Sequence, residues 1–111
     1  MQICKIMTFN MRTQTTNDGD NQFFLRAPYI KERLDAIKPD VIGMQEVQPS
    51  MYERLIADLP DYYIVGGGRG RDRGDEAVCV AFLKERFTLC DLETFWLSAT
   101  PHTPGSRYTG D

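Results

Sequence analysis

The sequence predicts an α/β fold in which one mixed β-sheet carries helices on one face. Short apolar runs alternate with amphipathic stretches of helical spacing, as in a βαβ unit. Two later apolar runs flank a short polar turn, which is typical of an antiparallel hairpin. With 111 residues, of which 41% are hydrophobic, the chain has the size and composition of one globular domain.

The first expected strand spans residues 3–10 and ends at Asn10. Met7 and Phe9 lie on one of its faces, whereas Thr8 and Asn10 lie on the other. The polar stretch 13–21 is predicted to be a solvated loop, because it lacks the spacing and the closing glutamate of an EF-hand.

The first helix is expected to begin at Pro28, since proline is favoured at the first helical position. Pro39 ends it. Its apolar stripe consists of Ile30, Leu34 and Ile37.

A mostly apolar run at 41–44 predicts a second strand, buried on both faces. It ends in Gln45 and Glu46. Because a buried unpaired carboxylate is costly, Glu46 needs a cation, a donor or water at the strand end. A βαβ connection favours parallel pairing, so Asn10 and Glu46 should meet at one sheet edge, where α/β proteins bind ligands.

Pro49 begins a second expected helix, whose apolar positions are Tyr52, Leu55, Ile56 and Leu59. Residues 62–65 predict a third strand, and the run 78–83 predicts a central strand. The run 87–97 is expected to be its hairpin partner, followed by loop. Two helices cover one sheet face at most, so the other face should need a second copy of the chain or a further segment.

The loop 66–76 is rich in glycine and contains three arginines. It matches neither GxxxxGK[ST] nor GxGxxG. It is either a mobile charged connection or a loop that reaches for phosphate, since arginine offers a fork of donors. A generic nucleotide-binding loop is a weaker interpretation, because both the lysine and a following helix are missing.

The net charge of −3 gives no global basic field that would attract nucleic acid. The chain contains three cysteines, which are Cys4, Cys79 and Cys90. Because their number is odd and they lack CxxC spacing, we expect them to be reduced, buried thiols in a cytoplasmic protein. A signal peptide removed earlier would leave no trace. No apolar run of about 18 residues predicts a transmembrane segment.

The candidate chemistry lies at the strand ends. His102 is the only histidine and lies in a Pro-rich loop, so neither a Ser-His-Asp set nor a zinc motif can be built. One carboxylate and one amide, from Glu46 and Asn10, suit a hard cation that keeps several waters. This favours Mg²⁺, with Mn²⁺ as the alternative.

Several stretches together resemble the N-terminal half of the endonuclease/exonuclease/phosphatase (deoxyribonuclease I-like) superfamily. Residues 5–12 end a strand in Asn, and residues 40–47 contain a strand that ends in Gln-Glu. The similarity continues through residues 68–72, Glu76, the stretch 93–101 (ETFWLSATP) and residues 104–106.

The resemblance implies a Mg²⁺-dependent phosphoesterase in a four-layer sandwich of two sheets with helices outside, of which this chain forms one sheet. It implies that Glu46 is the metal ligand and that Asn10 lies beside it as a second catalytic residue. The residues expected to border the substrate are Arg12, Glu76, Ser98, Arg107 and Tyr108. The substrate would be a phosphate ester in nucleic acid, a phospholipid headgroup or a nucleotide.

The family's second half supplies a histidine, a Gly-Asp-x-Asn motif and a closing Ser-Asp-His, and these are absent from the 111 residues. The resemblance therefore implies that residues 1–111 are an N-terminal portion, inactive without the C-terminal half as partner. The alternative is a non-enzymatic module of the same fold that binds phosphate or protein through its open sheet face.

Overall fold

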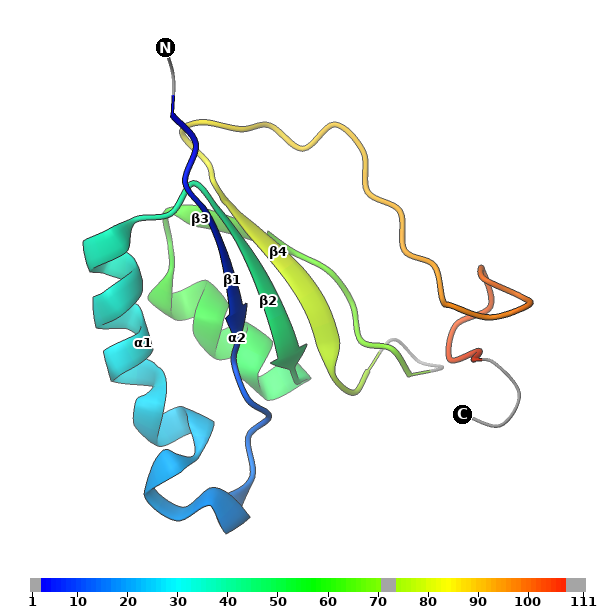
Figure 1. Cartoon of the computed structure of the whole chain (residues 1–111), viewed down its shortest axis with the longest axis horizontal. Helices are drawn as coiled ribbons and strands as arrows, with labels where there is room; N and C mark the ends of the chain where they lie inside the picture. Colours follow the sequence, from blue (N-terminus) through cyan, green and yellow to red (C-terminus); the bar gives the residue numbers. More distant parts are fainter. Residues whose placement is uncertain (1–2, 71–73, 108–111) are drawn as a thin grey trace.

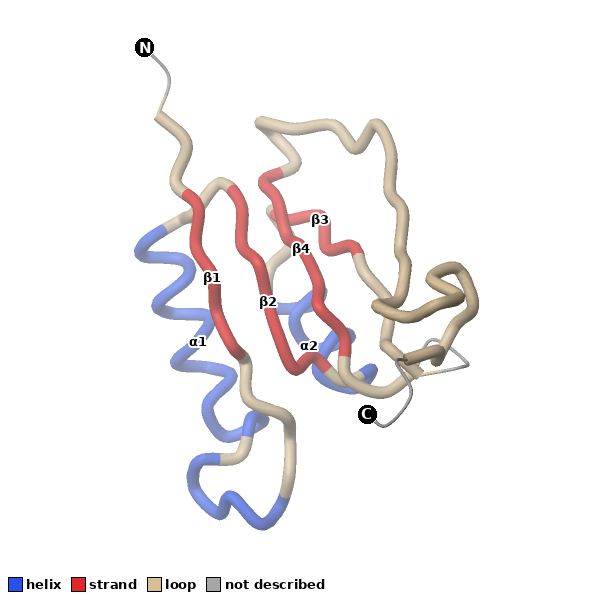
Figure 2. Tube along the Cα trace, turned by 45° about the vertical axis from the view of Figure 1, so that its right-hand side comes forward, coloured by secondary structure: helices blue, strands red, loops and turns tan. Residues whose placement is uncertain are grey.

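The computed structural model describes residues 3–70 and 74–107, which form one mixed four-stranded sheet with two α-helices on one face (Figures 1 and 2). This confirms the predicted fold class, and one sheet with one helical layer is consistent with half of a two-sheet sandwich. The elements in chain order are β1 (Ile6–Asn10), the 3₁₀ helix η1 (Thr16–Asn21), α1 (Phe23–Ile37), β2 (Val41–Val47), α2 (Pro49–Asp58), β3 (Tyr62–Val65) and β4 (Ala77–Leu83).

The strand order in the sheet is β1-β2-β4-β3. β1 and β2 pair in parallel through the crossover helix α1, with Asn10 opposite Gln45. β4 runs antiparallel to both of its neighbours, so its beginning lies at the carboxyl end of β2, where Val47 is paired with Ala77. The expected βαβ unit and the central position of the 78–83 strand are both confirmed.

The hydrophobic core lies between the two helices and one face of the sheet. It includes Met11, Phe23, Leu34, Ile42, Met44, Val47, Met51, Leu55, Ile64, Cys79, Ala81 and Leu83. Along β4, buried residues alternate with more exposed ones. In β2, Val41, Gly43 and Gln45 alternate with the buried Ile42 and Met44 and are only half-buried. The expectation that β2 is buried on both faces is therefore wrong, because within the described residues no second layer covers the other face.

We call this second face the open sheet face and define it by Ile6, Tyr63, Val78, Val80 and Phe82. Ile6 is 76% exposed and Val78 is 70% exposed. The rings of Tyr63 and Phe82 stack with their centroids 5.6 Å apart. Apolar side chains that gather on an exposed face are typical of a surface that binds a partner.

Helix α1 begins at Phe23 rather than at the predicted Pro28, which lies inside the helix. Phe23 and Ala27 extend the buried stripe of Ile30 and Leu34 by two further positions. Burial of this longer stripe against the sheet and α2 outweighs the hydrogen bond that proline removes. The predicted start of α2 at Pro49 is confirmed, although Met51 rather than Ile56 is buried on its inner face.

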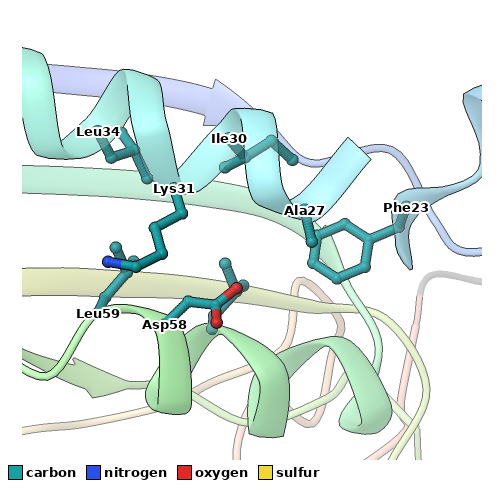
Figure 3. A pocket seen from close by; sticks show the side chains of 8 residues that line it. Phe23, Ala27, Ile30, Lys31, Leu34, Asp58 and Leu59 are labelled. Carbon is teal, nitrogen blue, oxygen red and sulfur yellow. The ribbon is translucent and has the colours of Figure 1, made fainter. Parts of the chain in front are cut away.

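The seam between the two helices is closed. Figure 3 shows Phe23, Ala27, Ile30 and Leu34 on the face of α1 that is turned toward α2, with Lys31 and Asp58 at the rim. The space among these side chains does not hold a water molecule. The seam therefore has no room for a ligand.

Two local predictions are wrong, one of a loop and one of a strand. Part of the predicted loop 13–21 is the 3₁₀ helix η1, which begins where the Thr15 hydroxyl accepts a hydrogen bond from the Asn17 N–H (3.2 Å). The segment 87–97 is not a strand. Both edges of β4 are already paired, with β2 and β3, so no free edge is left for a hairpin partner.

The expectation of free thiols holds for all three cysteines, whereas the expectation that they are buried holds only for Cys79. Cys79 is buried in the core, and burial raises the pKa of its thiol to about 11. Cys4 and Cys90 are exposed, and all three thiols are free. Among the described residues, no helix is both long enough and apolar enough to cross a membrane.

Candidate functional site

The carboxyl ends of β1 and β2 lie side by side at one edge of the sheet (Figure 1). Asn10 is the register partner of Gln45, and the Met11 N–H donates to the Gln45 carbonyl (3.0 Å) just beyond this pair. The Gln45 side chain donates back to the Thr8 hydroxyl (3.1 Å). Backbone and side-chain hydrogen bonds thus join the carboxyl ends of β1 and β2, although 35 positions separate Asn10 from Gln45 in the chain.

Glu46 occupies an irregularity in β2. The register with β4 passes from Met44↔Cys79 to Val47↔Ala77, so β2 carries one extra residue there. Glu46 has a left-handed backbone conformation with φ 60°, which costs roughly 1–3 kcal/mol for a residue other than glycine. Such bulges re-aim a side chain at the end of a strand, and Glu46 is left half-buried at the sheet edge.

Asn10 and Arg12 form a tight turn directly after β1. The Asn10 Oδ1 accepts the Arg12 N–H (2.9 Å), and Arg12 is left-handed with φ 58°. The Arg12 guanidinium donates to both carboxylate oxygens of Asp18 (2.8 and 3.0 Å). This hydrogen bond, then the charge of Asp18 and more weakly the charge of Glu46, raise the pKa of Arg12.

Glu76 reaches the same edge from the beginning of β4. Its Oε1 accepts a hydrogen bond from the Thr13 hydroxyl (2.6 Å), and the same hydroxyl lies 3.5 Å from the Glu46 carbonyl oxygen. The Arg69 Nη2 lies 3.5 Å from the Glu76 Oε2. Thr13 thus connects the ends of three strands. Its position directly after the Asn-x-Arg turn is the only sequence signal that could have pointed to it.

Four of the predicted site residues therefore gather at one edge: Asn10, Arg12, Glu46 and Glu76. Ser98 instead lies in a local turn, where its hydroxyl contacts that of Ser106 (2.7 Å). No hydrogen bond joins Ser98 or Arg107 to this edge within the described part of the chain. Tyr108 lies outside the described residues. The substrate role of these three residues stays a prediction.

The donors at this edge are oxygen atoms. Glu46 and Glu76 offer carboxylates and Asn10 an amide oxygen, but the described residues contain no group of three or more His, Cys, Asp or Glu side chains that could hold a metal ion. The part of the chain that the structure describes therefore does not form a closed cage of such ligands. The set fits a hard cation such as Mg²⁺, which binds through one or two carboxylates and keeps waters or substrate oxygens as its other ligands.

Comparisons of the sequence with family models and with curated proteins give no match. Comparison of the fold with solved structures does. An endonuclease/exonuclease/phosphatase from Bacteroides vulgatus is 29% identical over 91% of this chain, with a TM-score of 0.87. A protein of unknown function from Enterococcus faecalis is 26% identical over 96% of the chain, with a TM-score of 0.88.

A mannosyl-6-phosphatase from Bacteroides thetaiotaomicron shares the fold with a TM-score of 0.86 over 92% of this chain, at 23% identity. The chain spans only 39%, 41% and 39% of the lengths of these three proteins. The predicted resemblance is confirmed by the fold: this chain is similar to endonuclease/exonuclease/phosphatase proteins over about 40% of their length, which is consistent with an N-terminal half of that fold.

Proposed function

We propose that this chain supplies the Asn10–Glu46 edge of a Mg²⁺-dependent phosphoesterase. The observation that supports the proposal is the parallel pairing of β1 and β2, which lays the ends of the strands that carry Asn10 and Glu46 side by side, although they come from distant parts of the sequence. Arg12 and Glu76 lie at the same edge, so a divalent ion and a phosphate group would both find partners there. The similarity to an endonuclease/exonuclease/phosphatase supports the same reaction class.

In this proposal Glu46 holds the metal ion, with Mn²⁺ as a substitute for Mg²⁺. When bound, such an ion neutralises charge on the phosphate oxygens and stabilises the leaving oxygen. Asn10 orients the turn that carries Arg12, and Arg12 contacts the phosphate. The substrate is a phosphate ester, and nucleic acid, phospholipid headgroup and nucleotide esters all remain candidates within this class.

Changing Glu46 to Gln should abolish binding of a divalent ion at this edge. The substitution keeps the shape but removes the charge that attracts a hard cation. We expect Mn²⁺ to broaden the amide NMR signals of residues 10–13 and 45–47 in the wild-type chain. In Glu46→Gln, at least about 10-fold more Mn²⁺ should be needed, or the effect should vanish.

Glu53→Gln is the matched control, because Glu53 is an exposed carboxylate on the surface of α2. It removes the same charge from the chain and should leave the broadening unchanged. Equal effects of the two substitutions would show that Mn²⁺ senses only net charge, and the metal-binding role of Glu46 would have to be given up.

The 111-residue chain is expected to show no turnover by itself. In the proposed mechanism the groups that activate water are a histidine and aspartates from the second half of the fold, and general acid–base groups contribute about 10²–10⁴-fold to rate. Hydrolysis of p-nitrophenyl phosphate and bis(p-nitrophenyl) phosphate with Mg²⁺ or Mn²⁺ should match a protein-free blank. Metal-dependent turnover that co-purifies with the chain and is lost in Glu46→Gln would contradict this expectation.

A second candidate function is favoured by the open sheet face. Ile6, Val78 and Tyr63 are each at least half exposed there, as expected of a surface that binds a partner. In that case the chain is a non-enzymatic phosphate- or protein-binding module. The Mn²⁺ titration separates the two proposals, because the module needs no metal at Glu46.

A further inference from the structure

Three side chains form hydrogen bonds with Arg12. The Asn10 amide oxygen accepts its backbone N–H at 2.9 Å. The Arg26 Nη2 donates to its carbonyl at 3.2 Å and to the Met11 carbonyl at 2.8 Å. Asp18 binds its guanidinium through Nε and Nη2. The backbone and the side chain of Arg12 are therefore both fixed.

This fixation is not needed to anchor the loop between β1 and α1. Arg26 already ties both ends of that loop by its bonds to backbone carbonyls, the Asn21 carbonyl included. The left-handed backbone at Arg12 also costs free energy that a plain connection would avoid. Residues held in such conformations cluster at functional sites.

Asp18 uses only part of the guanidinium. Its two bonds engage two of the five N–H donors of arginine, which leaves three for another acceptor. The Arg12 side chain is 60% exposed, whereas that of Asp18 is 14% exposed. The acid is thus the more buried partner, and the remaining donors belong to a largely exposed side chain that directly follows the end of β1. The charge of Glu46 also contributes weakly to the raised pKa of Arg12.

We propose that Asp18 is a positioning residue that orients the Arg12 guanidinium to take a phosphate group beside Glu46. The inference rests on the proposed phosphoesterase function and names a residue that acts through Arg12 rather than on the substrate. A planar fork held by a carboxylate on one side presents its other donors in fixed directions, which suits the geometry of phosphate oxygens.

The test is a titration of the chain with inorganic phosphate at constant ionic strength and fixed Mg²⁺, followed by the NMR signals of the Arg12 backbone N–H and side-chain Nε–H. Asp18→Asn removes the charge and weakens the grip on the guanidinium. Asp20→Asn is the matched control, because it removes an equal charge from an exposed residue of the same segment η1, on the other side of the kink at Gly19. Asp18→Glu restores the carboxylate.

We expect Asp18→Asn to bind phosphate about 3–10-fold more weakly than Asp20→Asn, with Asp18→Glu within about 2-fold of the wild type. A simple Coulomb effect would instead strengthen phosphate binding equally in both Asn variants. If Asp18→Asn binds phosphate as tightly as Asp20→Asn or more tightly, Asp18 competes with phosphate or is irrelevant to it, and the inference is overturned.

Arg12→Lys gives an independent check, should Asp18→Asn fail to fold. The lysine keeps the positive charge but lacks the planar fork of guanidinium donors. We therefore expect the backbone amide signal of residue 12 to lose most of its shift on phosphate addition. An unchanged shift would overturn the inference. If the wild-type chain itself shows no phosphate-dependent shift at Arg12, the proposed phosphate site fails together with the positioning role. A wild-type response that survives in both Asp18→Asn and Arg12→Lys removes the positioning role alone.

Discussion

Replacing Phe23 with Ala is expected to lower the free energy of unfolding by about 3–5 kcal/mol, the usual cost of removing a buried aromatic ring. Phe23 is fully buried at the first turn of α1, with its ring turned toward α2 (Figure 3). A domain of this size has a total stability of about 5–15 kcal/mol. The loss is therefore a large share of what holds the chain folded.

The chain offers a matched control in the next residue. Phe24 belongs to the same helix turn, but its side chain is 37% exposed and only its ring edge meets Phe23. Phe24→Ala should cost about 1 kcal/mol or less. Urea unfolding followed by circular dichroism measures both. Similar losses of stability for the two variants would mean that Phe23 is not buried at the first turn of α1, and that the helix begins nearer Pro28.

Asp40 is expected to be the most sensitive charged position for stability. Its carboxylate is 8% exposed and accepts hydrogen bonds from the Lys5 N–H (2.7 Å) and the Arg86 Nη1 (2.6 Å). It thereby ties the beginnings of β1 and β2 to the turn after β4. Asp40→Asn leaves Arg86 facing an uncharged amide, and we expect the thermal midpoint to fall by about 5–10 °C.

The effect should depend on pH with a defined sign. The Lys5 N–H, followed by Arg86, lowers the pKa of Asp40 below its ordinary value of 3.8 in the folded chain. A lowered folded pKa means that the carboxylate stabilises the fold above the unfolded value, and that this contribution is lost as the pH falls through the folded value. The difference in stability between wild type and Asp40→Asn should therefore be full near pH 7 and shrink below about pH 3.8.

Denaturant unfolding of both chains at several pH values measures this difference. Asp61→Asn serves as the control, since Asp61 is an exposed residue in the turn before β3. It should show little effect at any of these pH values. A difference for Asp40→Asn that stays constant down to about pH 2 would show that the amide perturbs packing and that the charge is not what matters.

Sequence periodicity and proline positions were sufficient to predict most of the sheet. The βαβ crossover, the start of α2 and the central strand at 78–83 each followed from local patterns that the tertiary structure does not override. The start of α1 did not, because Pro28 has a strong local preference for a helix N-terminus and tertiary burial of Phe23 outweighs it. The segment 87–97 has a strand-like pattern, but β4 has no free edge to pair with it.

Only one feature of the candidate site could be predicted from the sequence, namely the sheet edge at which its residues lie, because this follows from the order and direction of the strands. Parallel pairing placed Asn10 and Glu46 at one edge from the sequence alone. The bulge that turns Glu46 and the hydroxyl of Thr13 that reaches Glu76 depend on contacts between three strand ends, and no local pattern encodes them. Asp18 could be recognised only once the 3₁₀ helix had brought it to Arg12, because the sequence around it reads as an ordinary polar loop.

The strand order has a consequence for how the protein is made on the ribosome. β1, α1 and β2 follow one another in the chain and are synthesised before β3 and β4, so their pairing can form early. β3 emerges next, but among the described residues it pairs only with β4, which is synthesised later and inserts between β2 and β3. The Asn10–Glu46 edge can thus be assembled early in translation, whereas Glu76 joins it only when the last strand closes the sheet.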